Sequence, residues 1–596
     1  MSLQQLLIQF VRRHAWAYAS SAVMLLGIAL LTVWLPHQVG KLVDALVGPG
    51  IALPDLAFEL GKMVVAGAGI YALRVAWRLR LYATAYRLGV ELRQRLFAQL
   101  TRQGPAFYQQ QRTGDLMALA TNDIDAVEMA AGEAMLAGFD GTLTFVLVLS
   151  TMMVVVDARL ALVTLLPFPF MALAFWWISR QVHAASRQSL QRFGELNDRV
   201  QETITGMRSL RALGLVPSSQ ARFAALTGTA AQAAVRTQRW EAAYEPAVGL
   251  SMTVASVSVL GYGGWLVWQQ QLSLGALTSF GLYLGQLIWP MFAAGWVLSL
   301  FERGRAAWGR LQPVLDAAPS IQDDGRRSEP PRGPLVATHL ALHYPEQNHA
   351  ALDGLTFTLA PGRTLGLVGP TGAGKSTLLA LLLRHWAPSH GMLQWDGTPL
   401  ADYQLDALRA AIAWVPQEPF LFSVSVAHNI ALARPGASRN DIERVARLAA
   451  VDDDIAGLPQ GYDTVVGERG VTLSGGQRQR IAIARALLAD AALLLLADAL
   501  SAVDAATEQR ILRSLRQARV GRSVIIVSHR LSAVADADDI LVLRHGRCVE
   551  QGTHAALLAT KGWYASQWQL QQLQAALESD DLPSDDALVN EVDDVV

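Results

Sequence analysis

A glycine-rich segment lies between an apolar strand pattern and an apolar helix pattern, and it predicts a phosphate-binding loop. The segment Gly369–Thr377 fits the pattern G-x-x-x-x-G-K-[ST]. Its glycines let successive backbone N–H groups point at phosphate oxygens, and the helix start adds a partial positive charge. Lys375 is expected to reach the β- and γ-phosphates, and the Ser376 hydroxyl to ligate Mg²⁺. We therefore expect a nucleoside triphosphate to bind Gly369, Pro370, Thr371, Gly372, Ala373, Gly374, Lys375, Ser376 and Thr377.

A second anion site is expected farther along the chain. Leu473–Gln477 opens the helix pattern Arg478–Leu488, and a helix start of this composition presents free N–H groups. The phosphate loop already surrounds its nucleotide on one side, so a second anion site in the same domain indicates that two such domains enclose two nucleotides. The expected residues are Ser474, Gly475, Gly476 and Gln477.

Three further side chains are candidates for contact with the nucleotide. Gln417 follows an apolar strand, and its amide could ligate Mg²⁺ or the attacking water, although this signal is weak when taken alone. His529 follows the strand Val524–Val527, at the strand end where doubly wound sheets bind ligands, so we expect it to contact the γ-phosphate rather than play a purely structural role. Tyr344 could stack on adenine or simply pack in the core.

The composition indicates a membrane protein with more than one domain. The chain has 596 residues, of which 52% are hydrophobic and only 17% charged, and its mean hydropathy is +0.26. The formal net charge of −1 predicts no nucleic-acid partner. The single cysteine, Cys548, cannot form an intrachain disulfide and fits a reducing compartment.

Apolar runs before about residue 300 predict transmembrane helices, because a helix needs roughly 20 apolar residues to cross a bilayer. Their approximate ranges are 16–36, 60–77, 136–156, 160–177, 248–268 and 274–298. The long connections between the second and third and between the fourth and fifth runs are rich in arginine, which marks the cytoplasmic side. Both termini are therefore expected in the cytosol. Asp140, near the start of the third run, is a functional candidate as an intramembrane carboxylate, unless it lies at the interface.

The remaining boundaries follow from composition and periodicity. The spans are expected to continue as helices into the cytosol, where Arg112–Asp125 and Gln201–Leu215 are candidates for short crosswise helices or for solvated loops. Residues 1–315 would form the transmembrane domain, and residues 316–334 a linker rich in proline and charge. An α/β nucleotide-binding domain would follow at 335–577, and an acidic, disordered tail at 578–596.

These motifs together resemble the nucleotide-binding domain of ABC transporters, and the spans ahead of them resemble an ABC exporter half-transporter of the type IV fold. In detail the chain is similar to MdlA/MdlB-type heterodimeric multidrug-like exporters. This finer likeness rests on Phe107–Asp125, Thr278–Met291, Gly461–Gly470 and Ala499–Asp504.

The resemblance implies a role for each matching residue. Tyr344 would stack on the adenine of ATP, Gly369–Thr377 would be the Walker A loop, and Gln417 the Q-loop residue. Ser474–Gln477 would be the signature that closes on the partner's ATP, and His529 the switch histidine. The resemblance also implies that Ala502–Asp504 lies in the D-loop and that Thr464–Gly470 is the X-loop. Arg112–Asp125 and Gln201–Leu215 would be coupling helices, and the second would dock on the partner's nucleotide domain.

The sequence departs from the family at Walker B, where an Asp that helps to hold Mg²⁺ is followed by a Glu that acts as catalytic base. Counting back from Asp504 places Ala497 at the Asp position and Asp498 at the Glu position; a slip of one residue would make Asp498 the metal residue and leave Ala499 as the base. Either register lacks one acid. Ala497 is either a natural loss or an introduced substitution. The site is therefore expected to hydrolyse ATP poorly.

We expect an ATP-driven exporter subunit of the bacterial cytoplasmic (inner) membrane. Its partner would be a second half-transporter, most simply in a heterodimer with one degenerate and one competent site. The cargo would be an amphipathic or hydrophobic small molecule or a lipid. The alternatives are a homodimeric flippase of lipids or lipid-linked molecules, and a regulatory subunit that binds ATP without turnover.

Overall fold

The computed structural model describes residues 1–48, 52–345, 347, 349–467, 470, 472–518 and 521–578. These residues form two compact units, which are described separately below. One comprises Met1–Thr101 and Arg112–Ala317, and the other comprises Arg102–Gln111 and the chain from Ala318 onward.

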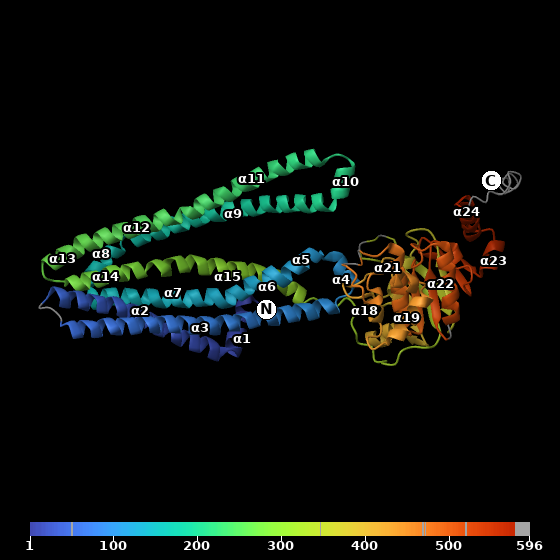
Figure 1. The fold of residues 1–596 in the computed structure, drawn as a ribbon, viewed down its shortest axis with the longest axis horizontal. Helices are drawn as coiled ribbons and strands as arrows, with labels where there is room; N and C mark the ends of the chain where they lie inside the picture. The colour runs from blue at the N-terminus through green and yellow to red at the C-terminus, as the bar shows by residue number, and fades with distance from the viewer. Residues whose placement is uncertain are drawn as a thin grey trace. The chain divides into compact units, whose positions relative to one another are not determined.

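The first unit is entirely helical, and its long helices run side by side (Figure 1). Six helical stretches are long and apolar enough to cross a membrane, and each contains one of the predicted spans: Ala15–Val47, Leu53–Arg102, Thr113–Val156, Ala158–Thr205, Val216–Trp268 and Leu274–Leu315. The predicted continuation of the spans as helices is also confirmed. The elements are α1 (Leu3–Arg13), α2 (Ala15–Val47), α3 (Leu53–Arg102), α5 (Thr113–Ala118), η1 (Leu119–Asp123), α6 (Ile124–Met129), η2 (Ala130–Ala134), α7 (Met135–Thr151), η3 (Met152–Val156), α8 (Ala158–Leu165), α9 (Pro167–Thr205), α10 (Met207–Ala212), α11 (Val216–Ala242), α12 (Tyr244–Ser258), η4 (Val259–Gly263), α13 (Gly264–Trp268), α14 (Leu274–Gln286) and α15 (Ile288–Leu315).

The prediction of a short, separate helix at Arg112–Asp125 is wrong. This segment opens the continuous stretch Thr113–Val156, and the short separate helix is α4 (Pro105–Gln110), earlier in the chain. Pro105 occupies the first turn of α4, where a missing N–H costs nothing. Gln111 and Arg112 are extended and separate α4 from α5. The second candidate, Gln201–Leu215, does contain a short helix, α10, which joins α9 to α11 (Figure 1).

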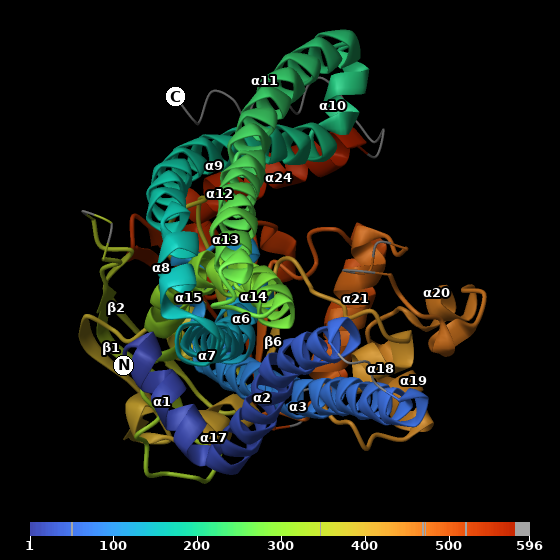
Figure 2. The ribbon, with the colours of Figure 1, turned by 90° about the vertical axis from the view of Figure 1, so that its left-hand side faces the viewer.

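The α9–α11 hairpin stands apart from the other long helices of this unit, as both views show (Figures 1 and 2). By contrast, the extensions of the third and sixth spans are tied together by an ion pair. Arg310 in α15 donates to both carboxylate oxygens of Asp123 in η1, at 3.0 and 2.6 Å. The Asp123 carboxylate is largely buried, so this bidentate pair fixes the two helices against each other.

The first and last spans approach closely along α2 and α14. A Cβ atom on Gly275 would overlap the carbonyl oxygen of Gly40, so neither position has room for a side chain. Asp44 accepts hydrogen bonds from the backbone N–H of Gly275 and from the hydroxyl of Ser273, both at 2.6 Å. The carboxylate therefore caps the start of α14 from the neighbouring helix.

Three side chains of α14 donate to backbone carbonyls of α2. Ser279 donates to Pro36 at 2.8 Å, Tyr283 to Val33 at 2.7 Å, and Gln286 to Thr32 at 2.9 Å. Pro36 lies inside α2 and has no N–H, so the carbonyl four residues earlier, on Thr32, lacks its helical donor. Gln286 supplies that donor from the neighbouring helix, as a membrane-spanning helix with an internal proline requires.

Gln286→Leu should therefore destabilise the chain by roughly 0.5–2 kcal/mol, because the Thr32 carbonyl loses its donor in an apolar environment. Pro36→Ala restores an intrahelical N–H, so the same Gln286→Leu change should cost much less in that background. Thermal unfolding of the four variants of this double-mutant cycle in one detergent measures the difference. Equal costs of Gln286→Leu in both backgrounds would contradict this account.

The second unit contains two sheets. A four-stranded antiparallel sheet has the order β2-β1-β4-β5, and a six-stranded sheet has the order β10-β9-β3-β8-β7-β6, in which only the β10–β9 pair is antiparallel. The strands are β1 (Leu335–Leu342), β2 (Leu352–Leu359), β3 (Thr364–Val368), β4 (His390–Trp395), β5 (Thr398–Pro399), β6 (Ile412–Val415), β7 (Leu493–Ala497), β8 (Ser523–Val527), β9 (Asp539–Arg544) and β10 (Arg547–Gly552).

The larger sheet is covered on both faces, on one by helices and on the other by α16 (Lys375–Leu382) together with strands of the four-stranded sheet. Along β7, Leu494 and Leu496 enter one buried cluster, whereas Leu493 and Leu495 enter another, as the alternation of a strand requires. The helices are α4, α16 (Lys375–Leu382), η5 (Leu400–Asp402), α17 (Leu405–Ala410), α18 (Val426–Ala431), α19 (Arg439–Leu448), α20 (Asp452–Ala456), η6 (Gly461–Asp463), α21 (Gly475–Leu488), α22 (Ala505–Ala518), η8 (Leu531–Ala533), α23 (His554–Ala559) and α24 (Trp563–Glu578). The predicted X-loop, Thr464–Gly470, lies partly outside the described residues, and so does the predicted acidic tail from residue 579 onward.

Candidate nucleotide site

The phosphate loop joins the carboxyl end of β3 to the first turn of α16. Gly369, Gly372 and Gly374 have φ angles of 145°, 81° and 101°, a region that side chains rarely adopt. A Cβ on Gly369 would overlap the Leu543 carbonyl oxygen, and one on Gly374 would overlap that of Ala351. The loop can therefore follow this path only with glycine at these positions, and its N–H groups converge at the start of α16.

Lys375 is held across the loop. Its side chain is buried, and Nζ donates to the carbonyl oxygens of Gly369 at 2.7 Å and Pro370 at 2.9 Å. Burial lowers the pKa of this ammonium group, and the nearby Asp498 carboxylate opposes the shift. A compact positive charge is thus placed inside the loop, where phosphate oxygens would be its partners.

A cavity of about 1170 Å³ opens over the loop. The described residues that line it include Tyr344, Thr371–Thr377, Gln417 and His529, so the fold brings together residues that are far apart in the sequence. Tyr344 packs edge-on against Trp386 at 5.0 Å, and its hydroxyl lies 3.4 Å from Thr377 Oγ1. Its ring therefore reaches the cavity from the four-stranded sheet.

The walls of this cavity fit Mg²⁺ in part. Ser376 and Gln417 both line the cavity, and the hydroxyl and amide oxygens of these residue types are hard donors of the kind that Mg²⁺ prefers. The strand end that would add a carboxylate carries Ala497 instead. Mg²⁺ commonly binds through few protein ligands together with phosphates and waters, so two oxygen donors suit an ion that arrives with a nucleotide.

Asp498 directly follows β7. It has a φ of 48°, a left-handed conformation that Asp tolerates better than most residues. Its N–H donates to the Val527 carbonyl at 2.7 Å, and its Oδ1 accepts the His529 N–H at 3.5 Å. The Asp498 carboxylate is therefore close to both Lys375 and the backbone of His529. The residue before it, Ala497, has no acidic side chain.

The second predicted anion site does not line this cavity. Ser474 and Gln477 form a capping box: the Ser474 hydroxyl accepts from Gln477 N at 3.2 Å, and the Gln477 side chain accepts from Ser474 N at 3.0 Å. The amide of Gln477 also donates to Asp454 at 3.2 Å. Ser474–Gln477 thus forms an ordered helix start that is separate from the residues around Lys375.

One wall of the cavity, the turn between β9 and β10, was not predicted from the sequence. Arg544, His545, Gly546 and Arg547 line the cavity, and the Gly546 carbonyl accepts from Asp353 N at 2.9 Å. His545 and Gly546 have φ angles of 46° and 78°, which are typical of the tight turns that connect adjacent antiparallel strands. The His-Gly pair between two apolar strand patterns was a usable signal for a hairpin, but not for its position beside the phosphate loop.

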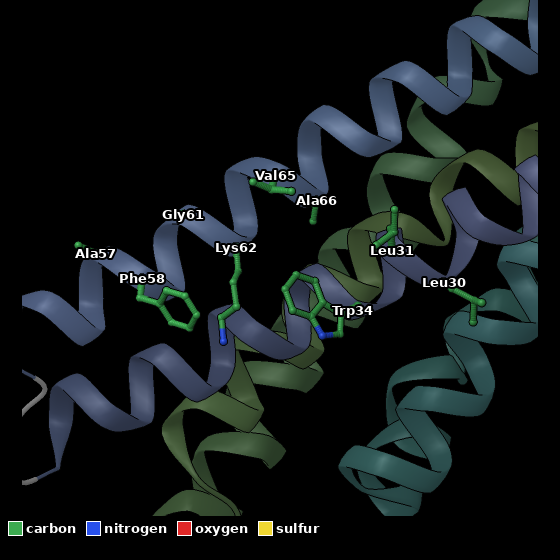
Figure 3. Close-up of a pocket in the computed structure, with 9 residues that line it drawn as sticks. All are labelled: Leu30, Leu31, Trp34, Ala57, Phe58, Gly61, Lys62, Val65 and Ala66. Atoms are coloured by element: carbon green, nitrogen blue, oxygen red, sulfur yellow. The ribbon is translucent and has the colours of Figure 1, made fainter.

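A second cavity, of about 860 Å³, lies between α2 and α3 in the helical unit. Figure 3 shows Trp34 of α2 and Phe58 and Lys62 of α3 directed into the space between the two helices. Lys62 is paired with Glu59 at 2.5 Å and lies over the Phe58 ring. The remaining walls are apolar, so an alkyl chain or another hydrophobic group fits this cavity chemically.

A helical unit built for a membrane, joined to a phosphate-loop α/β unit, defines an ATP-driven membrane transporter subunit. Family comparison agrees. The family model of the ABC transporter transmembrane region matches residues 21–291, and the ABC transporter model matches residues 352–501. The chain belongs to the ABC transporter family, as an exporter half-transporter.

Individual relatives cover almost the whole chain. The multidrug resistance-like ATP-binding protein MdlA of Escherichia coli is 44% identical over 96% of this chain and 97% of its own length. The ATP-dependent lipid A-core flippase of Chromobacterium violaceum is 33% identical over 93% of this chain and 95% of its own. The solved structure of a bacterial Atm1-family ABC exporter with ATP bound superposes with a TM-score of 0.78 at 30% identity, over 94% of this chain and 98% of that one. These likenesses confirm the predicted fold class.

Proposed function

We propose that this chain exports amphipathic or hydrophobic compounds across the bacterial cytoplasmic membrane as one subunit of a heterodimer. In that heterodimer the ATP site on this chain's own phosphate loop hydrolyses poorly, and the second site is competent. The observation that carries the asymmetry is the end of β7, where Ala497 takes the place of an acid and Asp498 that of the longer Glu. A general base typically contributes about 10²–10⁴-fold, and a carboxylate that is one methylene shorter lies farther from the water it should activate.

Residues that line the nucleotide cavity are assigned the roles that their chemistry supports. Tyr344 stacks on adenine, Lys375 and the loop hold the phosphates, and Ser376 and Gln417 ligate Mg²⁺. His529 contacts the γ-phosphate. Asp498, whose carboxylate opposes the lowering of the Lys375 pKa by burial, is assigned to orient the attacking water, and its short side chain supports a site that binds ATP and cleaves it slowly.

Ser474–Gln477 completes the competent site. Its helix start lies outside this chain's own cavity. The capping box uses the N–H groups of Ser474 and Gln477, so those of Gly475 and Gly476 suit a nucleotide held by another chain. ATP-dependent closure of the two nucleotide domains would turn the membrane helices outward, and hydrolysis at the competent site would reset them. Both termini lie in the cytosol, on the side marked by the arginine-rich connections.

The cargo proposal rests on chemistry and on relatives. The cavity between α2 and α3 has mostly apolar walls, and the E. coli relative is named as multidrug resistance-like. A homodimeric lipid flippase is the second candidate, supported by the 33% identity to the lipid A-core flippase. It requires two equal sites, which the missing acid at position 497 disfavours. An ATP-binding regulatory subunit would fit the same missing acid but would add nothing to transport.

The asymmetry can be tested with a partner half-transporter that has an intact Walker B pair. The mixed dimer should turn over ATP, and Glu→Gln at the partner's catalytic base should abolish that turnover, because the remaining site lacks an effective base. Steady-state phosphate release from the reconstituted dimer is the measurement. Turnover that persists with the Glu→Gln partner would reject the proposed asymmetry.

A further inference from the structure

One side chain of α24 forms hydrogen bonds with the backbone on both sides of Arg530. Gln571, in α24, donates from Nε2 to the carbonyl oxygen of His529 at 2.8 Å, and its Oε1 accepts from the N–H of Leu531 at 2.9 Å. The Gln571 amide thus makes the two kinds of hydrogen bond, one donated and one accepted, that a neighbouring strand would make with the segment that carries His529. Both bonds have ordinary geometry, and both would be lost if this amide were removed.

The opposite side of the same segment is held by Arg530. Its Nη1 donates to the carbonyl oxygen of Val503 at 2.9 Å and to Glu508 Oε2 at 2.8 Å. Glu508 is almost fully buried, with 3% of its surface exposed, and it also accepts from Ser532 at 3.0 Å. The segment 529–532 is therefore fixed between the region that follows Asp498 and the helix α24.

The position of the His529 ring depends on this backbone clamp. His529 lines the nucleotide cavity, and its N–H faces Asp498 at 3.5 Å, a long contact. The Gln571 bonds are shorter and act on the carbonyl side of the same residue. Rotation of the His529 backbone would swing the ring away from the phosphate loop, and Gln571 resists that rotation.

We propose that Gln571 is a positioning residue that holds His529 in contact with the γ-phosphate of ATP. This inference rests on the γ-phosphate role of His529 stated under Proposed function. Because ADP lacks the γ-phosphate, the clamp contributes to the preference for ATP over ADP and not to nucleotide binding in general. The C-terminal helix is thereby part of the nucleotide sensor.

The test measures equilibrium Kd values for ATP and ADP, with Mg²⁺, on the purified full-length chain in lipid nanodiscs. Gln571→Ala should weaken ATP binding about three- to tenfold, the effect of one or two lost hydrogen bonds, and leave the Kd for ADP unchanged. Gln571→Glu has nearly the same shape but cannot donate to the His529 carbonyl, so it should weaken ATP binding at least as much. The neighbouring Gln572 is exposed, and Gln572→Ala is the matched control, expected to leave both Kd values unchanged.

His529→Ala separates this inference from the function on which it rests. If His529→Ala lowers the preference for ATP and neither Gln571 variant does so, Gln571 is not a positioning residue, and the role of His529 stands. If His529→Ala has no effect on the preference, the γ-phosphate role and this inference both fall. In the double variant, Gln571→Ala should add nothing to His529→Ala, whereas additive losses would assign Gln571 to general stability. If Gln571→Ala does not fold, Gln571→Asn, which keeps the amide but is one methylene too short, replaces it.

Discussion

Ala497→Asp combined with Asp498→Glu is expected to raise ATP hydrolysis at this chain's own phosphate loop by about 10²–10⁴-fold in the mixed dimer whose partner carries Glu→Gln, the usual contribution of a positioned general base. β7 already delivers position 497 to the cavity end of the sheet, where it pairs with Val527, so the new carboxylate needs no rearrangement of the strand. The added methylene at position 498 carries the second carboxylate towards the attacking water. Phosphate release from this mixed dimer in nanodiscs measures the gain.

The single variants separate the two acids. Ala497→Asp alone should raise the affinity for Mg²⁺ in the presence of ATP roughly 10–100-fold, because the acid orients the waters around the ion. Its turnover should stay low, because the base is still too short. Ala497→Asn is the matched control that adds a polar side chain without charge. A double variant that is no faster than the parent chain would show that the missing acids are not what limits hydrolysis.

Lys375→Ala is expected to weaken ATP binding by this chain about 10–100-fold, the range for a lost hydrogen bond to a charged group. Two effects combine: the charge aimed at the phosphates disappears, and the carbonyls of Gly369 and Pro370 lose the donor that braces the loop. Lys375→Arg keeps the charge, but a planar guanidinium cannot replace the compact ammonium at the same buried point, so it should not restore full affinity.

Equilibrium nucleotide binding to the full chain checks this prediction, and circular dichroism confirms that the variants are folded. Lys41→Ala serves as the control, since Lys41 lies in α2 of the helical unit and not in the nucleotide unit. Unchanged ATP affinity in Lys375→Ala would mean that the loop does not hold the phosphates.

Much of the nucleotide site was predictable because its chemistry is local in the sequence. The glycine spacing predicts the phosphate loop. The positions of Gln417 and His529 after apolar strands predict that they are site residues. The doubly wound sheet then brings these strand ends to one edge. The six spans were equally predictable, since their length and hydropathy are set by the bilayer.

The rest could not be predicted because it depends on contacts between distant segments. The turn His545–Gly546 and the clamp by Gln571 lie beside the phosphate loop and His529 only after the sheet has formed, and nothing in their local sequence indicates those neighbours. The misplaced helix has a different cause. The Thr113-Gly114-Asp115 signal was assigned to a short helix, although it begins a long one, and Pro105 was the more informative residue.

Along residues 32–36 of α2, the hydrogen bonds to α14 are chemically one-sided. α14 contributes side chains, whereas α2 contributes main-chain oxygens, which are present whatever residue carries them. Substitutions at positions 32 and 33 should therefore be tolerated at little cost, whereas substitutions at positions 279, 283 and 286 should not. A saturation library scored for folded protein would show that positions 32 and 33 of α2 are permissive, whereas the positions of α14 that bond to this stretch are intolerant.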